Sequence, residues 1–441
     1  MNPTDSPSCQ YLPQPRLYRS KYPNQPMLLY KGFAEIILDE KVFEGNATVL
    51  LVWFPCPHAS FEFTYFGKTK VELDDFTLKL TEIGVSALAS VSEKRYYGAD
   101  DKSVISGYFC EPVVQGSQKE LASLAFYITN FPFFNISNTW GIEEEELEGW
   151  LELYFEGQFV FQTDEWRIIL ATLPDSWDIH DLLRTQGGYA LTHMCKLERL
   201  DRSPFSLEDA REQLQAFSFY LSFARGIWIA PILLFGYDAQ GEQVFEEWSD
   251  CSADSWQNTC EWFSPDSTEL VQAFPGFMQR WNSLAWRELI QESIQWYVES
   301  SKQAGGAEGA IVLQQAALER LAWVFLVEEK RNLSKDGFHK LSAADKIRQL
   351  LSHLEIKLEI PARLNNIKNV SKAENWDDGP QAITEIRNAI IHPDPKKRHK
   401  GSGASPVVKN EAWNLGLQYL ELVLLKLFNY PYAYLYDLEE D

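Results

Sequence analysis

The chain has 441 residues, of which 45% are hydrophobic and 14% aromatic, and it carries a formal net charge of −23. This composition is typical of a folded protein and excludes a disordered one, and the length is sufficient for two or three domains. The longest apolar run, residues 227–235, is interrupted by Pro231. It is too short to span a bilayer, so we expect no membrane partner.

The cysteine pattern and the N-terminus indicate the compartment. The six cysteines are scattered and none forms a C-x-x-C pair, so neither a disulfide framework nor a zinc site is expected. The first 27 residues are polar and rich in proline, and they lack the hydrophobic core of a signal peptide. We interpret residues 1–27 as a loose N-terminal arm and expect a cytoplasmic protein without metal or cofactor.

Residues 28–270 predict a β-rich domain. Short segments alternate between apolar and polar side chains, most strictly at 61–65 and 76–80, and glycines separate them. Regular spacing of such strands is typical of a sandwich or a barrel-like sheet. A capped helix is expected at 206–225, followed by a buried strand at 227–236 and a hairpin return to Trp248. The other expected strands are 32–38, 47–54, 105–109, 121–129, 150–155 and 166–170.

The predicted β-rich domain contains no recognisable catalytic motif. It has no phosphate-binding glycine loop, no nucleophile elbow and no zinc-protease helix. Residues 249–280 are mixed in pattern, and the proline-containing triplets at 264–266 and 274–276 are expected to break helices. We therefore place the domain junction there.

From residue 280 to the C-terminus the apolar period becomes helical, which predicts an all-α bundle and an α+β protein as a whole. Helices are expected at 281–302, 309–329, 341–355, 361–370 and 378–392, and from Pro406 onward. The last helix repeats large apolar residues at 4-3-4-3 spacing, which we interpret as an internal packing seam. The seam consists of Trp413, Leu417, Leu420, Leu424 and Leu427.

Charge is unevenly distributed between the two predicted domains. Residues 1–279 carry 19 Lys and Arg against 41 Asp and Glu, whereas residues 280–441 carry 21 against 22. The acidity therefore belongs to the β-rich domain. Only the helical domain is electrostatically open to a polyanion such as RNA.

The segment 378–400 carries the clearest functional signal. Asp378 is a good helix cap and Pro380 suits the first helical turn. His392 closes the helix, because the following Pro393 pushes its preceding residue out of the α region. A helix that begins and ends so clearly places its last turns at a defined position.

Arg387, Asn388 and His392, in the run Arg-Asn-Ala-Ile-Ile-His, resemble the arginine, polar residue, spacer and histidine motif of HEPN domains. The resemblance covers residues 280–441. It implies a helical bundle that forms a homodimer and acts as a metal-independent endoribonuclease, with these three residues as the catalytic group. It also implies that two motifs meet across the dimer in one composite site.

The residue types suit RNA cleavage without a metal. The ribose 2′-hydroxyl can attack the adjacent phosphorus if a base removes its proton, and histidine is the obvious base near neutral pH. The planar guanidinium of Arg387 can grip phosphate oxygens in pairs, and Asn388 can donate to phosphate or orient the pair. Just behind the motif, a basic loop of four residues is expected to bind the RNA backbone. The loop residues are Lys396, Lys397, Arg398 and Lys400.

Three observations keep other interpretations open. Arg348 and His353 have the same spacing, but no polar residue follows Arg348 and no helix breaker follows His353, so we regard this pair as a chance match. Arg387 and His392 could instead form a salt-bridged helix end with a dipole-stabilised histidine. Five helical positions also place Arg387 and His392 roughly 140° apart, so they converge only if the helix end bends or a second copy faces them.

The two-domain architecture is similar to that of ApeA-type abortive-infection proteins of bacterial phage defence. This resemblance implies that the β-rich domain senses or restrains, with a phage-derived or host protein as its trigger, while the helical domain cleaves RNA as a toxin. The alternative is a catalytically inactive HEPN-like scaffold that binds RNA or protein.

Overall fold

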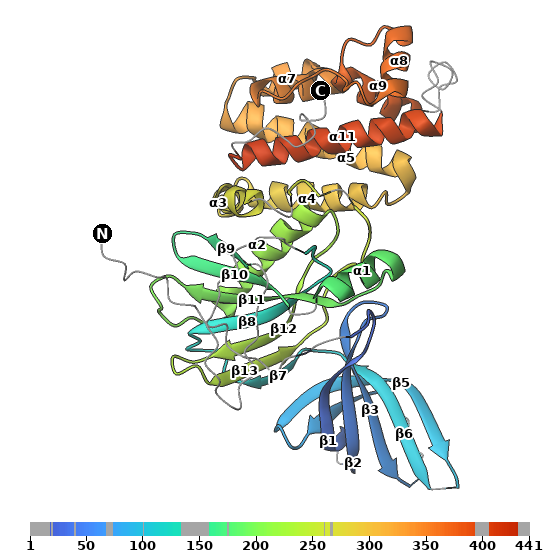
Figure 1. Ribbon diagram of the computed structural model, residues 1–441, viewed down its shortest axis with the longest axis vertical. Helices are drawn as coiled ribbons and strands as arrows, with labels where there is room; N and C mark the ends of the chain where they lie inside the picture. Colours follow the sequence, from blue (N-terminus) through green and yellow to red (C-terminus); the bar gives the residue numbers. More distant parts are fainter. Residues whose placement is uncertain are drawn as a thin grey trace. The chain divides into compact units, whose positions relative to one another are not determined.

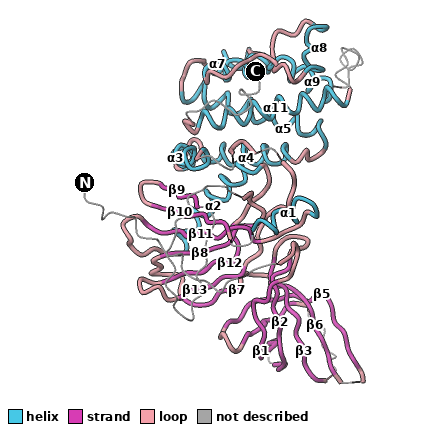
Figure 2. Tube along the Cα trace, in the orientation of Figure 1, coloured by secondary structure: helices cyan, strands magenta, loops and turns pink. Residues whose placement is uncertain are grey.

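The computed structural model describes residues 18, 21–38, 41–67, 74–99, 101–133, 158–173, 176–259, 261–264, 268–392 and 405–430. The predicted α+β class is confirmed, because the described strands lie before residue 250 and only helices follow from residue 269 onward (Figures 1 and 2). The chain forms two compact units. The β-rich unit comprises Met1–Ser218 and Trp228–Asn258, and the helical unit comprises Phe219–Ile227 and Thr259–Asp441.

The first element of the β-rich unit is a closed antiparallel barrel with the strand order β1-β2-β3-β6-β5-β4. Its strands are β1 (Met27–Leu38), β2 (Lys41–Val52), β3 (His58–Phe66), β4 (Asp75–Leu80), β5 (Val85–Tyr97) and β6 (Lys102–Phe109). The alternation in the sequence fills the interior, where Phe61 and Phe63 are buried and Phe63 lies opposite Ile105. The pattern did not predict β5, because its second half is polar and exposed.

The second element is a seven-stranded antiparallel sheet with the order β7-β13-β12-β8-β11-β10-β9. Its strands are β7 (Val113–Gly116), β8 (Ser123–Thr129), β9 (Gln158–Gln162), β10 (Trp166–Thr172), β11 (Leu191–Arg199), β12 (Pro231–Tyr237) and β13 (Gln243–Trp248). The central strand β8 is buried at every position. Helix α2 (Leu207–Arg225) packs on the sheet through Phe217, whose ring lies 5.1 Å from that of Phe161.

The expected strand at 150–155 lies outside the described residues, as does most of the predicted N-terminal arm. Helix α1 (Ser176–Gln186) was not predicted. The four cysteines in the described part of the chain are free thiols. They are Cys56, Cys110, Cys195 and Cys251.

The helical unit contains more helices than the sequence predicts. They are α3 (Glu269–Trp281), α4 (Arg287–Ser301), α5 (Gly306–Trp323) with a π-helical continuation η1 (Val324–Glu329), α6 (Lys335–Lys340), α7 (Ala343–His353), α8 (Asn365–Glu374), α9 (Gly379–Ile391) and α11 (Pro406–Leu427). The packing seam of α11 is internal, as predicted, with Leu417, Leu420, Leu424 and Leu427 all buried.

The prediction that the triplet 274–276 breaks a helix is wrong, because helix α3 continues through it. Pro275 removes a helical hydrogen bond, at a cost of about 3 kcal/mol. Six buried side chains of α3, among them Phe274 and Phe277, offset this cost by removing apolar surface from water. Gly276 is needed for packing, since a Cβ there would overlap the carbonyl of Phe428 at the end of α11.

One helix in the described part of the chain, residues 306–329, is long and apolar enough to cross a membrane by length and composition alone. Of its most apolar window, 56% is buried inside the protein. The helix packs against α4, α7, α9 and α11. Its apolar character is therefore explained by its place at the centre of a helical bundle.

Candidate active site

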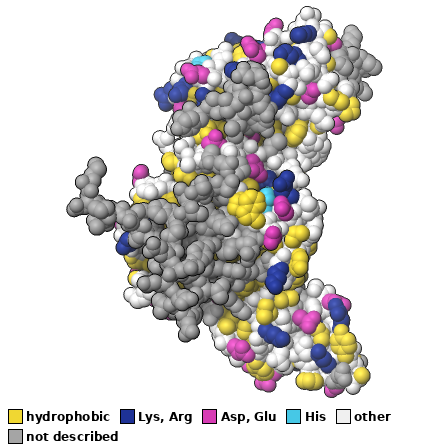
Figure 3. Space-filling model, viewed as in Figure 1, with side chains coloured by type: hydrophobic (Ala, Val, Ile, Leu, Met, Phe, Trp, Pro, Cys, Tyr) yellow, Lys and Arg dark blue, Asp and Glu magenta, His cyan; other side chains and the backbone are white. Residues whose placement is uncertain are grey.

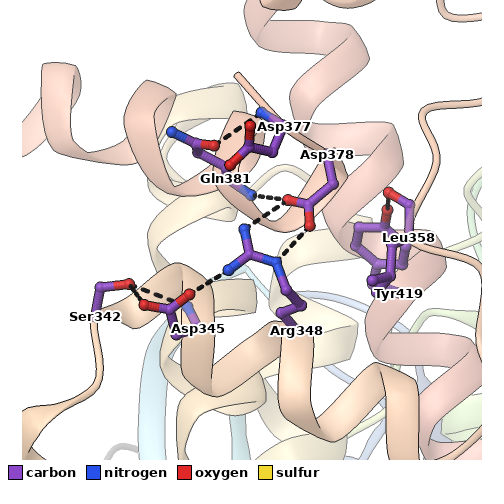
Figure 4. Close-up of polar contacts among 8 residues, drawn as sticks. All are labelled: Ser342, Asp345, Arg348, Leu358, Asp377, Asp378, Gln381 and Tyr419. Atoms are coloured by element: carbon purple, nitrogen blue, oxygen red, sulfur yellow. Dashed lines mark hydrogen bonds and ion pairs between the residues drawn. The ribbon is translucent and has the colours of Figure 1, made fainter. Parts of the chain in front are cut away.

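The motif helix α9 begins as predicted and is fixed there by a charge network. The side chain of Asp378 accepts a hydrogen bond from the backbone N–H of Gln381 at 2.9 Å, and Pro380 occupies the first turn. The same carboxylate receives two donors from Arg348 of α7, with Nε at 2.5 Å and Nη2 at 3.1 Å (Figure 4). The remaining nitrogen of that guanidinium, Nη1, donates to the carboxylate of Asp345. A cap that is also one half of an ion pair sets the position of α9.

This network includes the arginine of the other Arg–His pair at the same spacing, Arg348 and His353. The guanidinium of Arg348 is occupied by Asp345 and Asp378, and its pKa is raised by the hydrogen bond to Asp378. His353 is exposed, and its Nδ1 lies 2.8 Å from the carbonyl of Gln349 one turn earlier. The pair therefore has local structural contacts.

The first turn of α9 is also docked on α11 without space for a side chain. A Cβ at Gly379 would overlap the hydroxyl of Tyr419. The carbonyl of Leu358 accepts a hydrogen bond from the Tyr419 hydroxyl at 3.0 Å (Figure 4). The same carbonyl accepts from the Gly379 N–H at 2.8 Å. Burial raises the pKa of Tyr419 well above its usual value, so the hydroxyl remains a donor.

The second half of α9 has a different environment. Ile383 and Ile386 are buried, but Arg387, Asn388 and His392 are only half-buried. Arg387 Nη1 donates to the side-chain oxygen of its neighbour Asn388 at 3.2 Å. No carboxylate among the described residues pairs with Arg387, and its Nε is buried without a hydrogen-bond acceptor. A partly desolvated cation without a counter-ion is costly unless an anionic ligand completes its shell.

His392 is the C-cap of α9, as predicted. Its backbone N–H donates to the carbonyl of Asn388 at 3.0 Å, and its φ of −92° and ψ of 130° take the chain out of the helix. The main departure from helical geometry is in ψ, the rotation about the bond that follows the Cα atom. The Cβ of His392 therefore keeps roughly the direction that the helix gives it. Among the described residues no side-chain hydrogen bond joins His392 to Arg387 or Asn388.

Exposed apolar side chains lie where α9 ends and α11 begins. Ile391 is 42% exposed and Val407 is 53% exposed. Ile391 is the last residue of α9, directly before His392, and Val407 lies in the first turn of α11. Each is an exposed apolar side chain at a helix end.

The predicted RNA-binding loop, with Lys396, Lys397, Arg398 and Lys400, lies outside the described residues, as does Pro393. A different basic segment was not predicted. Residues 330–372 carry 10 Lys and Arg against 4 Asp and Glu. A charge count in a short sliding window would have found it, whereas the domain-wide sum hides it.

In the described ranges, no three His, Cys, Asp or Glu side chains come together in a group that could hold a metal ion.

The profile of the YopA central domain matches residues 116–259, and that of the YopA C-terminal domain matches residues 283–440. A relative, the SPbeta prophage-derived uncharacterized protein YopA of Bacillus subtilis (strain 168), is 28% identical over 420 residues, which cover 93% of this chain and 91% of the relative. No solved structure matches the chain. The chain is thus similar to the prophage protein YopA along nearly all of its length, and its Arg387–His392 motif lies in the part that matches the YopA C-terminal domain.

Proposed function

We propose that the protein is a metal-independent endoribonuclease whose site is formed by Arg387, Asn388 and His392. The observation that carries the proposal is the half-buried guanidinium of Arg387, which has no acidic partner in the described part of the chain. In a chain with 63 Asp and Glu residues such a guanidinium is available for an anionic substrate. Arg348, at the same spacing from a histidine, is already neutralised by two aspartates.

The chemistry follows from these three side chains. His392 removes the proton of a ribose 2′-hydroxyl, and the oxygen attacks the adjacent phosphorus. Arg387, oriented through Asn388, stabilises the charge that grows on the phosphoryl oxygens. The bond from phosphorus to the 5′-oxygen breaks, and that oxygen takes up a proton. The products are a 2′,3′-cyclic phosphate and a free 5′-hydroxyl.

The working unit in this proposal is a homodimer through the helical unit. Arg387 and His392 stand roughly 140° apart on one helix, so a second copy is needed to place a base opposite the phosphate that the first copy holds. The exposed Ile391 and Val407 supply an apolar surface for that contact.

The biological setting that fits best is phage defence in the bacterial cytoplasm, with RNA cleavage as the toxic step. The support is the prophage origin in the name of the relative, because genes carried by prophages take part in conflicts between phages and their hosts. The β-rich unit would then receive the trigger, a phage-derived or host protein, and release the ribonuclease.

The test is incubation of the purified protein with total RNA in the presence of EDTA, followed by analysis of the RNA ends. We expect cleavage with cyclic phosphate and 5′-hydroxyl ends, and no cleavage by the Arg387→Ala/His392→Ala protein. The control is His353→Ala, which removes an exposed histidine at the same spacing and should leave cleavage intact. Intact RNA with the wild-type protein, both with and without its trigger, would favour the inactive scaffold.

A further inference from the structure

The helical unit contains a strongly basic segment that the proposed active site does not use. Residues 330–372, which include α6, α7 and most of α8, carry a net charge of +6, from 10 Lys and Arg against 4 Asp and Glu. The remainder of the chain carries 30 Lys and Arg against 59 Asp and Glu, a net charge of −29. Lys and Arg side chains lie over the region of α7 and α8 on the face drawn in Figure 3. Positive charge is thus concentrated in one tenth of the sequence.

Half of these cations have no acidic partner in the described part of the chain. Lys330, Lys346 and Arg348 form ion pairs with Glu329, Glu319 and two aspartates. The unpaired cations are Arg331, Lys335, Lys340, Lys368 and Lys372, and all except Lys368 are exposed. Because their positive charge is not neutralised locally, it is available to a polyanion.

Aromatic rings lie within the first part of the segment. Trp323 is half-buried, and its ring centroid is 5.3 Å from that of the exposed His339 and 5.2 Å from that of Phe338. The ammonium group of Lys346 lies 5.1 Å from the Phe338 ring and holds it in place. The indole N–H of Trp323 donates to Glu328 at 2.6 Å, which fixes the orientation of the ring. Aromatic rings in a segment with unpaired cations can stack nucleic-acid bases while the cations neutralise phosphates.

We propose that Trp323, Arg331, Lys335, His339 and Lys340, which we call the α6 surface, bind single-stranded RNA. The aromatic pair favours unpaired bases, because a base inside a duplex has no free face to stack on Trp323 or His339. The strong negative charge of the remaining chain directs a polyanion toward this surface.

The α6 surface would guide substrate RNA to the proposed active site, and this role rests on the proposed function. Arg348 of α7 holds the cap of α9, and α9 has 13 residues and a length of about 20 Å before it reaches His392. A strand bound at the α6 surface would thus be held on the same helical unit as the proposed site. RNA would be anchored at a place different from the place where it is cut.

The first experiment measures binding of a labelled single-stranded oligouridine in the Arg387→Ala/His392→Ala protein, so that cleavage does not interfere. The test variant is Arg331→Gln/Lys335→Gln/Lys340→Gln. Its matched control, Lys31→Gln/Lys41→Gln/Lys119→Gln, removes three exposed and unpaired lysines from the β-rich unit. The slope of log affinity against log salt should fall by about 2 in the test variant, because each single-strand phosphate contact contributes about 0.7. Equal slopes in the two triple variants would overturn the proposal.

The second experiment tests stacking. Trp323→Ala should weaken oligouridine binding about five- to a hundredfold, whereas Trp323→Phe should retain most of the affinity because a ring remains. Trp177→Ala serves as the control, since Trp177 is 52% exposed on α1 of the β-rich unit. If duplex RNA binds as tightly as oligouridine, or if Trp323→Ala folds correctly and binds normally, the stacking surface is refuted.

The two proposals fail in different ways. Oligouridine binding that depends on the α6 surface, together with no cleavage of total RNA by the wild-type protein, would refute the ribonuclease and leave the RNA-binding surface. Cleavage that depends on Arg387 and His392, together with binding that is unaffected in the triple variant, would refute the α6 surface and leave the ribonuclease.

Discussion

Arg387 and Arg348 are both half-buried arginines at the same distance in sequence from a histidine, and their partners distinguish them. Arg348 is held by Asp345 and Asp378, whereas Arg387 has only the neutral oxygen of Asn388. In the sequence, the Arg387–His392 pair differs from the Arg348–His353 pair only in the polar Asn388 and in the Pro393 that follows the histidine. The structure adds the physical reason, which is that the first arginine is already neutralised.

From this difference we expect opposite effects of matched substitutions. Arg387→Ala or His392→Ala should reduce RNA cleavage at least about a hundredfold without lowering the melting temperature, since the first removes charge stabilisation of the transition state and the second removes the base. Arg387→Lys should also be strongly impaired, because an ammonium cannot replace a planar fork. Initial cleavage rates on a defined RNA, together with thermal melts, measure both quantities.

The contrasting variant is Arg348→Ala. It leaves the largely buried Asp378 without its counter-ion, so the free energy of unfolding should fall by about 2–4 kcal/mol. Cleavage at low temperature should persist. Loss of cleavage in a folded Arg348→Ala protein, with normal cleavage by Arg387→Ala, would show that the roles of the two pairs are reversed.

A second residue-scale prediction concerns a buried carboxyl group in the core of the helical unit. Glu421 of α11 is 2% exposed, Tyr297 donates to its Oε2 at 2.7 Å, and its Oε1 has no hydrogen-bond donor among the described residues. Burial raises the pKa of Glu421 from 4.5 to about 8. The folded state therefore retains this proton more strongly than the unfolded state, and the stability that it contributes is lost as the pH rises from about 4.5 to about 8.

The measurement is thermal unfolding followed by circular dichroism at pH 5, 6.5 and 8. The melting temperature of the wild-type protein should fall across this series beyond the general effect of pH. Glu421→Gln keeps an oxygen for the Tyr297 hydroxyl and cannot titrate, so its profile should be flatter. Parallel profiles for the two proteins would mean that Glu421 is not the responsible group.

At the scale of single elements, agreement between sequence and structure follows the strength of local signals. The limits of α9 were predictable because each signal is local: the Asp378 side chain caps the first turn, Pro380 fits that turn, and a residue before a proline such as Pro393 is disfavoured in the α region. Helix α3 was missed because the local penalty of Pro275 is outweighed by tertiary burial, which no local pattern reveals. The polar second half of β5 was missed for the same reason, since its pairing with β6 supplies the order.

The features of the candidate site likewise fall into those that local sequence signals predict and those that only tertiary packing reveals. Arg387, Asn388 and His392 could be named from the motif, but the clamp from Arg348 to Asp378 joins residues that are 30 positions apart. The lack of room for a side chain at position 379 is caused by Tyr419, which lies 40 positions further along the chain. Such contacts become visible only when the helices are packed.

The predicted basic loop after α9 is tested by replacing Lys396, Lys397, Arg398 and Lys400 with glutamine. If the loop binds the RNA backbone, the affinity for RNA should fall and the salt slope should decrease by about 3, because each of the four phosphate contacts contributes roughly 0.7. Cleavage of bound RNA in single-turnover experiments should change less than affinity, because these cations hold substrate and transition state alike. An unchanged slope would reduce the loop to solvated surface.

At the scale of the whole molecule, the dimer can be tested through its apolar contact. Ile391→Asp/Val407→Asp should convert the dimer into a monomer and abolish cleavage, because the composite site can no longer form. The control is Leu284→Asp, which changes a 93% exposed leucine elsewhere in the helical unit and should leave the dimer intact. Sedimentation at micromolar concentration measures both. A wild-type monomer under these conditions, or a dimer that survives the double substitution, would contradict this arrangement.

The contact of Gly379 with Tyr419 has a practical consequence for genetics. Any larger residue at 379 displaces the Tyr419 hydroxyl from the carbonyl that anchors the motif helix, without touching Arg387 or His392. If the protein is toxic as proposed, we expect Gly379→Ala to be a conditional allele. It should be tolerated by cells in the warm, where the weakened helix start is released, and harmful in the cold, where the helix can still dock with Tyr419 displaced. Growth of cells that carry the allele at the two temperatures, beside an Arg387→Ala strain that grows at both, would measure this. If the protein is toxic as proposed, a substitution at position 379 would then allow its gene to be propagated in the warm and its activity to be switched on by cooling.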